Sequence, residues 1–365
     1  MIRQSAREGT ESMARVSIIV RSMDRPELHD ALRSIAAQSA PDVEVIVVAA
    51  SGPGHSPPPS HCGRYPIRYV PGDLPRQRPV AANAGIDAAT GAFIGLLDDD
   101  DLLLPAHVET LVAALDESPA CPAAYAVVRE VDSEGHVVQF RARPFSQLLL
   151  YQDCYIPPCS LLFRRTALAH CRFDEALDIC QDWDFWLQLS ELGDFAFVSK
   201  ETSVFRSSLG TSGTGVAGNR DYDRYRRYRA MLATKWERRG REVSAAVDAA
   251  AAHAFRLFAN GRRNDAETAA DRVLASYPYE VTALNLKGTL LAMRNDFDGA
   301  LAIFRTAAAE APADAASRFN LAQALERLGR AAEASSEYER ILTLVPGHPQ
   351  AAARKAALAA GNSKQ

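Results

Sequence analysis

Four consecutive carboxylates, Asp98 to Asp101, are the side chains of this sequence best placed to do chemistry. They follow an apolar run of strand length, residues 91–97, and precede Pro105, which is well placed to open a helix. Adjacent ionised acids repel one another and cannot be buried without compensation. A positive partner is therefore expected, and carboxylate oxygens at the end of a strand suit Mg²⁺ or Mn²⁺, which also bridge nucleotide phosphates. The alternative is a solvated acidic turn.

Strands and helices alternate in the first third of the chain. Strand-length apolar runs and helically spaced apolar residues follow one another in the order 16–20, 28–35, 43–48, 67–70 and 80–90. This order predicts a largely parallel sheet with helices on its faces, and residues 53–66 are expected to be an irregular loop. Ligands of such sheets bind at the carboxyl ends of the strands. Ser22, Asp24 and Ser51 follow the first two strands, so we expect them to converge there with the four acids as contacts for a nucleotide.

Length and composition limit the classes of protein that need consideration. The chain has 365 residues, 47% of them hydrophobic and 24% charged, which is ordinary for a soluble protein of two domains. A net charge of −4 gives no general attraction to nucleic acid, and no apolar run approaches the ~20 residues of a membrane-spanning helix. Residues 1–14 are polar and predict a disordered lead. The six cysteines show no pairing pattern, which favours a reducing cytoplasm.

The last third of the chain repeats. Residues of the same kind recur every 34 positions: prolines at Pro278, Pro312 and Pro346, small residues at Ala254, Gly288 and Ala322, and turn residues at Gly261, Asn295 and Gly329. This period resembles the tetratricopeptide repeat and predicts units at 247–280, 281–314 and 315–348, followed by a capping helix. Such solenoids bind peptides or other subunits through their concave face. By the phase of the repeat, that face would carry Phe255, Phe258, Asn285, Thr289, Phe319, Gln323 and Glu326, unless these residues pack between repeats.

A second resemblance covers about residues 15–208. Motifs in the expected order resemble family 2 glycosyltransferases with the GT-A fold: residues 16–28, Ala82-Asn83-Ala84-Gly85-Ile86, Leu97-Asp98-Asp99-Asp100-Asp101 with Pro105, Leu161-Leu162-Phe163-Arg164-Arg165, Phe173-Asp174-Glu175 and Asp182-Trp183-Asp184-Phe185-Trp186-Leu187. Each motif alone is weak, and their common order makes the resemblance specific.

The resemblance implies an inverting, hexosyltransferase-like reaction, in which a sugar passes from a nucleotide diphosphate, with UDP favoured, to an acceptor hydroxyl. The D-x-D motif of the family falls on Asp98-Asp99-Asp100. It implies that Asp98 and Asp99 contact the donor and that Asp98 and Asp100 bind Mn²⁺ or Mg²⁺. Asn83 stands in an Asn-x-Gly motif as a further donor contact. The catalytic base of the family falls on Asp182, whose simpler interpretation is the N-cap of an amphipathic helix.

Some positions depart from the family pattern. Ala49 and Ala50 stand where acidic residues commonly hold the nucleobase, and Gln181 stands where Glu commonly precedes the base. Arg76 and Arg78 are candidates for a diphosphate contact, and no His follows Phe205-Arg206. These departures leave a second hypothesis open, in which a catalytically degenerate glycosyltransferase-like domain serves as an adaptor and the repeats do the binding.

The expected organisation is an α/β GT-A domain, Rossmann-like and typical of nucleotide-diphospho-sugar transferases, at 15–212, a linker with a basic helix at 213–246, and an all-α repeat solenoid at 247–365. Expected partners are a nucleotide sugar, a glycan, lipid-linked or polypeptide acceptor, and a protein bound by the repeats, but no nucleic acid. The basic, Tyr-rich stretch 220–241 predicts a connecting helix whose tyrosines pack on the catalytic domain. The alternative is peripheral contact of a cytoplasmic protein with the inner face of a membrane.

Overall fold

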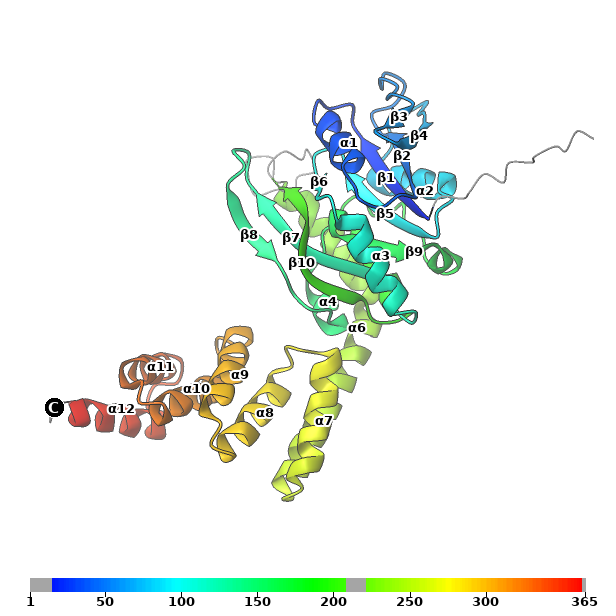
Figure 1. The fold of residues 1–365 in the computed structure, drawn as a ribbon. Coiled ribbons are helices and arrows are strands. Elements are labelled where there is room, and N and C mark those ends of the chain that lie inside the picture. Colours follow the sequence, from blue (N-terminus) through cyan, green and yellow to red (C-terminus); the bar gives the residue numbers. More distant parts are fainter. Residues whose placement is uncertain (1–14, 208–220, 363–365) are drawn as a thin grey trace, which may run out of the picture. The chain divides into compact units, whose positions relative to one another are not determined.

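The computed structural model describes residues 15–207 and 221–362. The chain divides into two compact units, Met1–Glu237 and Arg238–Gln365, and each is described by itself (Figure 1). The first unit contains β1 (Val16–Ser22), α1 (Leu28–Ala36), β2 (Val43–Ala49), β3 (His61–Cys62), β4 (Tyr65–Val70), α2 (Arg78–Ala88), β5 (Phe93–Asp98), β6 (Leu102–Leu103), α3 (His107–Glu117), β7 (Ala123–Val131), β8 (Val137–Arg141), α4 (Gln147–Gln152), β9 (Leu161–Arg164), α5 (Gln181–Ser190), β10 (Ala196–Arg206) and the start of α6 (Tyr222–Ala259).

The strands form one ten-stranded sheet in the order β3-β4-β2-β1-β5-β9-β7-β10-β6, with β8 paired to β7. β4, β2, β1 and β5 are parallel, as the alternation of strands and helices predicted. Their carboxyl ends therefore share one edge of the sheet, where Asp98 ends β5. The loop predicted for 53–66 is wrong in part, because β3 pairs with β4 in antiparallel fashion and β4 begins at Tyr65.

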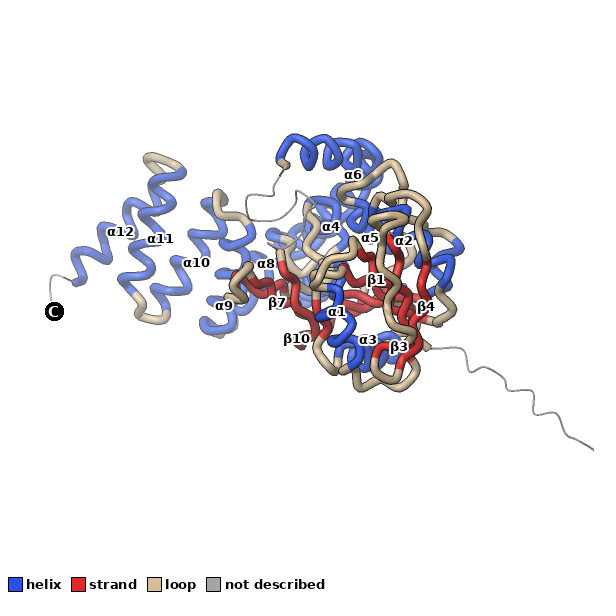
Figure 2. Tube along the Cα trace, turned by 90° about the horizontal axis from the view of Figure 1, so that it is seen from above, coloured by secondary structure: helices blue, strands red, loops and turns tan. Residues whose placement is uncertain are grey.

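Helices cover both faces of the sheet (Figure 2). Side chains that alternate along β1, β2 and β5 divide between two apolar cores. One core lies under α2 and α5 and includes Ile19 and Trp186, and the other lies under α1 and α3 and includes Ile18 and Leu111. This packing of both faces explains why the parallel strands are apolar along most of their length.

The second unit consists of helices. After the end of α6 come α7 (Arg263–Ser276), α8 (Val281–Met293), α9 (Phe297–Glu310), α10 (Ala315–Arg327), α11 (Ala331–Leu344) and α12 (Pro349–Asn362). The small residues of the repeat lie where helices approach closely: a Cβ added at Gly288 would be 2.5 Å from Cε1 of Phe304. Asn285 donates to Ser317 Oγ (2.7 Å) and accepts from Asn320 (2.9 Å), so at least part of the expected concave face bonds between repeats. The predicted tetratricopeptide fold is confirmed.

The basic helix predicted near 220–241 is the first part of α6. Leu232 is buried there, and Tyr225, Tyr228 and Trp236 pack against the first core of the sheet. The connecting-helix interpretation is thereby confirmed for the tyrosines at 225 and 228, and contact with a membrane finds no support. Within the described residues, no helix is both long and apolar enough to span a membrane.

A buried histidine makes the stability of the first unit dependent on pH. His107 begins α3, and its Nδ1 lies 2.9 Å from Oγ1 of Thr202. Burial lowers the pKa of His107 from 6.5 to about 4. Because the unfolded chain takes up this proton at a higher pH than the folded chain, the stabilisation is complete above pH 6.5 and is lost as the pH falls towards 4. Protonation of His107 should therefore lower the unfolding free energy by up to about 3 kcal/mol between pH 6.5 and pH 4.

Urea unfolding of the wild type and of His107→Gln at pH 7 and pH 4.5 measures this contribution. The loss of stability on acidification should be smaller in the variant. Equal losses in the two proteins would contradict the assignment to His107.

Candidate active site

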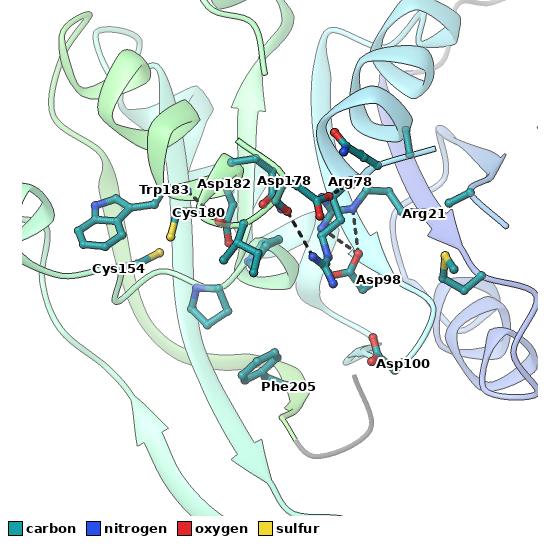
Figure 3. Close-up of a pocket in the computed structure, with 18 of the residues that line it drawn as sticks. Arg21, Arg78, Asp98, Asp100, Cys154, Asp178, Cys180, Asp182, Trp183 and Phe205 are labelled. Atoms are coloured by element: carbon teal, nitrogen blue, oxygen red, sulfur yellow. Dashed lines mark hydrogen bonds and ion pairs between the residues drawn. The ribbon is translucent and has the colours of Figure 1, made fainter. Parts of the chain in front are cut away.

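A cavity of about 670 Å³ opens at the carboxyl ends of β1 and β5 (Figure 3). Its wall is completed by the turn before α5, the end of β10 and the start of α6. The volume lies within the range typical of sites for small molecules. Among the residues expected to act together, Asp98, Asp100 and Asp182 all line it, although Asp182 is more than 80 positions from the others in the sequence.

The acids of the run 98–101 have arginine partners. Arg21 is almost fully buried and binds Asp98 through two hydrogen bonds, from Nε (2.8 Å) and Nη2 (3.0 Å). Arg25 binds Asp99 and lies 3.0 Å from Asp100. The sequence predicted a positive partner and favoured a divalent cation for that role. The structure shows that the protein supplies part of the positive charge itself, from Arg21 near the end of β1 and from Arg25 just after it.

Asp99 and Asp101 do not line the cavity. Asp99 is fully buried and accepts a hydrogen bond from the backbone N–H of Met23 (2.7 Å) in addition to the contact with Arg25. The carboxylate of Asp101 accepts from the backbone N–H of Arg206 (2.9 Å). The side chain of Asp99 is directed into the protein, where it holds the loop after β1, so the expected donor contact by Asp99 stays a prediction that this geometry does not favour.

The acid cluster fits a divalent cation. Asp98, Asp100 and Asp101 each offer a carboxylate oxygen, and these oxygens lie within 4.8 Å of one another. Burial and the nearby charge of Asp98 raise the pKa of Asp100 to about 6, and burial raises the pKa of Asp101 well above its usual value. A cation would relieve this crowding of negative charge, and hard oxygen ligands suit Mg²⁺ or Mn²⁺. The two predicted ligands, Asp98 and Asp100, both belong to the cluster.

Asp182 lies in the first turn of α5. The helix begins at Gln181 and its N-cap is Cys180, which has a left-handed backbone (φ 65°), so the N-cap interpretation of Asp182 is wrong. Its carboxylate accepts from the backbone N–H of Trp183 (2.9 Å). Burial raises the pKa of Asp182, and the positive charge of Arg21 opposes that shift. In Figure 3, Asp182 lies on the side of Cys180 and Trp183, whereas Asp98 and Asp100 lie on the side of Arg21.

The Asn-x-Gly motif positions a loop. Asn83 exchanges hydrogen bonds with the backbone of Phe173 (3.0 and 3.2 Å) and donates to Glu175 (3.1 Å). A Cβ at Gly85 would come within 2.3 Å of Ile19, so this glycine lets α2 approach β1. The expected donor contact by Asn83 is not supported, because its amide is occupied by the segment that leads towards α5.

Ser22, Asp24 and Ser51 lie near the ends of β1 and β2 but are not among the described residues that line the cavity. Ser22 Oγ accepts from the backbone of Asp24, which has a left-handed φ of 62° and accepts from the N–H and Oγ of Ser56 (both 3.1 Å). Ser51 differs from these two, because its buried Oγ has no hydrogen-bond partner within the described part of the chain.

Sequence reasoning missed several residues of the cavity wall. Asp178 accepts from Arg224 of α6 and from the backbone of Arg78 (3.4 Å), so it links the start of α2 to the start of α6. Arg78, one of the two arginines proposed for the diphosphate, lines the cavity, and burial lowers its pKa. Arg76 also lines the cavity, but its guanidinium binds the backbone carbonyls of Ala49 (3.1 Å) and Pro71 (2.7 Å). The sequence predicted Arg76 and Arg78 as candidate diphosphate contacts, whereas Asp178 and Arg224 carry no signal of that kind.

Comparison with known proteins agrees with this arrangement. Residues 17–172 match the family model of glycosyl transferase family 2, and residues 251–315 and 291–358 match two models of tetratricopeptide repeats. The chain is 26% identical over 183 residues to the "Uncharacterized glycosyltransferase YwdF" of Bacillus subtilis (strain 168), a match that covers 48% of this chain and 68% of that protein.

Two further matches have lower identity. The "Uncharacterized glycosyltransferase MJ1057" of Methanocaldococcus jannaschii is 22% identical over 186 residues, which cover 47% of this chain and 63% of that protein. The crystal structure of S. aureus TarS aligns with a TM-score of 0.43 at 17% identity, over 53% of this chain and 36% of that one. Residues 17–172 therefore belong to a family 2 glycosyltransferase domain, and residues 251–358 belong to tetratricopeptide repeats.

Proposed function

We propose that this protein is an inverting, metal-assisted glycosyltransferase that moves a hexose from a UDP-sugar to an acceptor hydroxyl. One observation carries the proposal: Asp182 lines the same cavity as Asp98 and Asp100 but on another side of it. A base and a donor site must be separated in this way, because the acceptor attacks the anomeric carbon from the face opposite the leaving diphosphate.

Asp182 is the proposed general base. As the acceptor oxygen forms its bond to the anomeric carbon, the bond from that carbon to the diphosphate oxygen breaks, and the acceptor proton passes to the Asp182 carboxylate. Burial raises the pKa of this carboxylate, which brings it nearer to that of an effective base at neutral pH. The backbone N–H of Trp183 fixes its orientation.

Asp98 and Asp100 would hold Mn²⁺ or Mg²⁺, which supplies Lewis-acid stabilisation of the charge that develops on the diphosphate. Arg21 and Arg78 line the cavity near Asp98 and add positive charge for the same leaving group. Ser51 is the proposed nucleobase contact, since its buried hydroxyl has no partner among the described residues. Ser22, Asp24 and Asn83 act through the loops that they hold.

Donor binding tests the proposal most directly. Titration calorimetry with UDP-, GDP- and dTDP-sugars, with and without Mn²⁺, should show metal-dependent binding of one nucleotide, and Asp100→Ala should lose the metal-dependent part. Asp153→Ala is a matched control, because Asp153 also lines the cavity but lies outside the acid cluster. No binding across the panel would favour the adaptor hypothesis, and unchanged binding by Asp100→Ala would remove that ligand assignment.

We also propose that the repeat domain recruits the acceptor or a partner protein and so raises the local concentration of acceptor at the cavity. The repeats form a compact unit of their own, and α6 packs on the first core only as far as Trp236 among its described contacts. Deletion of Val247 to Gln365 therefore keeps the packed part of α6. We expect the shortened protein to bind donor normally but to use its natural acceptor at least tenfold less efficiently. Undiminished transfer to that acceptor would contradict recruitment.

The six cysteines are unpaired, which supports a reducing cytoplasm as the proposed location.

A further inference from the structure

The start of α6 forms part of the cavity wall. Arg224 and Tyr225 line the cavity, although both lie outside the segment 17–172 that matches the glycosyltransferase family. This part of the helix therefore belongs to the site, and it is contributed by the region of the chain that sequence reasoning treated as a connection.

Two polar anchors and one apolar contact hold this part of α6 in place. Arg224 forms an ion pair with Asp178 at the start of the helix. Further along, Lys235 Nζ lies 3.0 Å from the fully buried carboxylate of Asp184, and Trp236 Nε1 donates to the same carboxylate (2.8 Å). Leu232 is buried between these anchors. Tyr225 thus has a fixed position in the free protein, as a preorganised substrate contact requires.

Tyr225 lies on the acceptor side of the cavity. Tyr225 lines the cavity together with Cys154, Cys180 and Asp153. Its phenol lies near enough to these groups and to Arg229 to interact with them electrostatically. Cys154 and Cys180 lie beside Asp182 and Trp183 in Figure 3. An inverting transfer places the acceptor next to the base and away from the diphosphate. The wall that contains Tyr225 is therefore the wall that an acceptor would touch.

Among the residues that the structure describes, three aromatic ones line the cavity, Trp183, Phe205 and Tyr225, and Tyr225 is the one whose ring a ligand could contact. The ring of Trp183 is buried and has the guanidinium of Arg229 over it at 5.9 Å, and Arg141 lies 5.8 Å from the ring of Phe205. Within the described residues, no cation lies over the ring of Tyr225, although Arg229 is near enough to influence its phenol, and the hydroxyl has no hydrogen-bond partner. Burial raises the pKa of Tyr225, so the phenol stays protonated and can donate.

An aromatic face beside a free hydroxyl matches a pyranose ring, which presents C–H groups on one face and hydroxyls around its edge. A serine or threonine of a polypeptide offers no comparable ring. We infer that Tyr225 is the platform of an acceptor subsite and that the acceptor is a sugar residue of a glycan. This inference rests on the proposed function, because Asp182 as base defines the acceptor side.

Saturation-transfer NMR of the full-length protein can test the inference with a panel of methyl pyranosides (glucose, galactose, mannose and N-acetylglucosamine) and a Gly-Thr-Gly peptide. Binding is measured with and without UDP and Mn²⁺. The variants are Tyr225→Phe, which removes only the unpaired hydroxyl, and Tyr225→Leu, which also removes the ring. Tyr228→Phe and Tyr228→Leu are matched controls, because Tyr228 packs on the same core one turn further along and does not line the described cavity.

At least one pyranoside should bind the wild type. Its Kd should rise about threefold in Tyr225→Phe and about tenfold or more in Tyr225→Leu, and it should stay at the wild-type value in both Tyr228 variants. The affinity for UDP should be the same in all five proteins.

Three results would overturn the inference: no pyranoside binds although UDP does, the Tyr225 variants bind like the wild type, or the peptide binds in a Tyr225-dependent way while the sugars do not. If UDP binds to none of the five proteins, that result counts against the proposed function. The binding of pyranosides in the absence of nucleotide would then still test the role of Tyr225.

Discussion

Replacement of Asp182 by Asn should lower the rate of sugar transfer by about 1000-fold and leave donor affinity within about twofold. The amide has nearly the same shape and can still accept the hydrogen bond from the backbone of Trp183, but it cannot take the acceptor proton. Single-turnover kinetics and calorimetry with the donor separate the two effects. In the wild type, the transfer rate should rise with pH through an apparent pKa above the ordinary value of Asp, since burial raises the pKa of Asp182.

Asp153→Asn is the control for this substitution. Asp153 carries an exposed carboxylate and lines the same cavity, so the variant loses an equal charge at a similar place. Because Asp153 lies on the acceptor wall, the two variants are compared at saturating acceptor, where the transfer rate of Asp153→Asn should stay within about threefold of the wild type. Turnover of Asp182→Asn at the wild-type rate would show that another group is the base.

Asp184→Asn should destabilise the first unit by about 3 kcal/mol. Asp184 is fully buried in α5, and its carboxylate binds Lys235 at 3.0 Å, Trp236 Nε1 at 2.8 Å and Gln188 Nε2 at 2.7 Å. All three partners donate hydrogen bonds. The amide oxygen of Asn can accept from some of them, but the NH₂ group of Asn would face the remaining donors and could not bind them. Denaturant unfolding followed by tryptophan fluorescence measures the loss, because Trp236 reports on this contact.

The comparison variant is Asp174→Asn, which removes a carboxylate bound to the same Lys235 but one-third exposed to solvent. An exposed pair contributes little, so this change should cost less than about 1 kcal/mol. Similar losses in the two variants would show that burial of Asp184 does not determine its contribution.

Local pattern was sufficient to predict much of the fold. The apolar runs at 16–20 and 43–48 became β1 and β2, because a strand buried on both faces needs no alternation. In the last third, the 34-residue period placed helices α8 and α10 at the start of the second and third predicted units. These features depend on residues close together in the sequence or on a regular repeat, and both can be recognised without knowledge of the tertiary structure.

Features that depend on distant segments were not predicted. Residues 21–24 looked like a polar turn, but β1 continues to Ser22 and Arg21 is buried because it faces Asp98 across the β1–β5 pair. Asp24 and Cys180, which are not glycines, adopt left-handed backbones beside the site. The start of α6 likewise has a basic sequence that is typical of a solvent-exposed helix. Its contacts with Asp178 and Asp184 join segments far apart in the chain, so the sequence pattern does not predict them.

The order of the charged residues along the chain also has a consequence for synthesis on the ribosome. Arg21 and Arg25 precede the acid run in the chain. Asp98, Asp99 and Asp100 can therefore form their ion pairs with these arginines as soon as β5 pairs with β1. Asp101 accepts its hydrogen bond from the backbone N–H of Arg206, which is synthesised about 100 residues later. A nascent chain that ends between these points therefore contains Asp101 without its final partner, and this contact forms only when β10 joins the sheet.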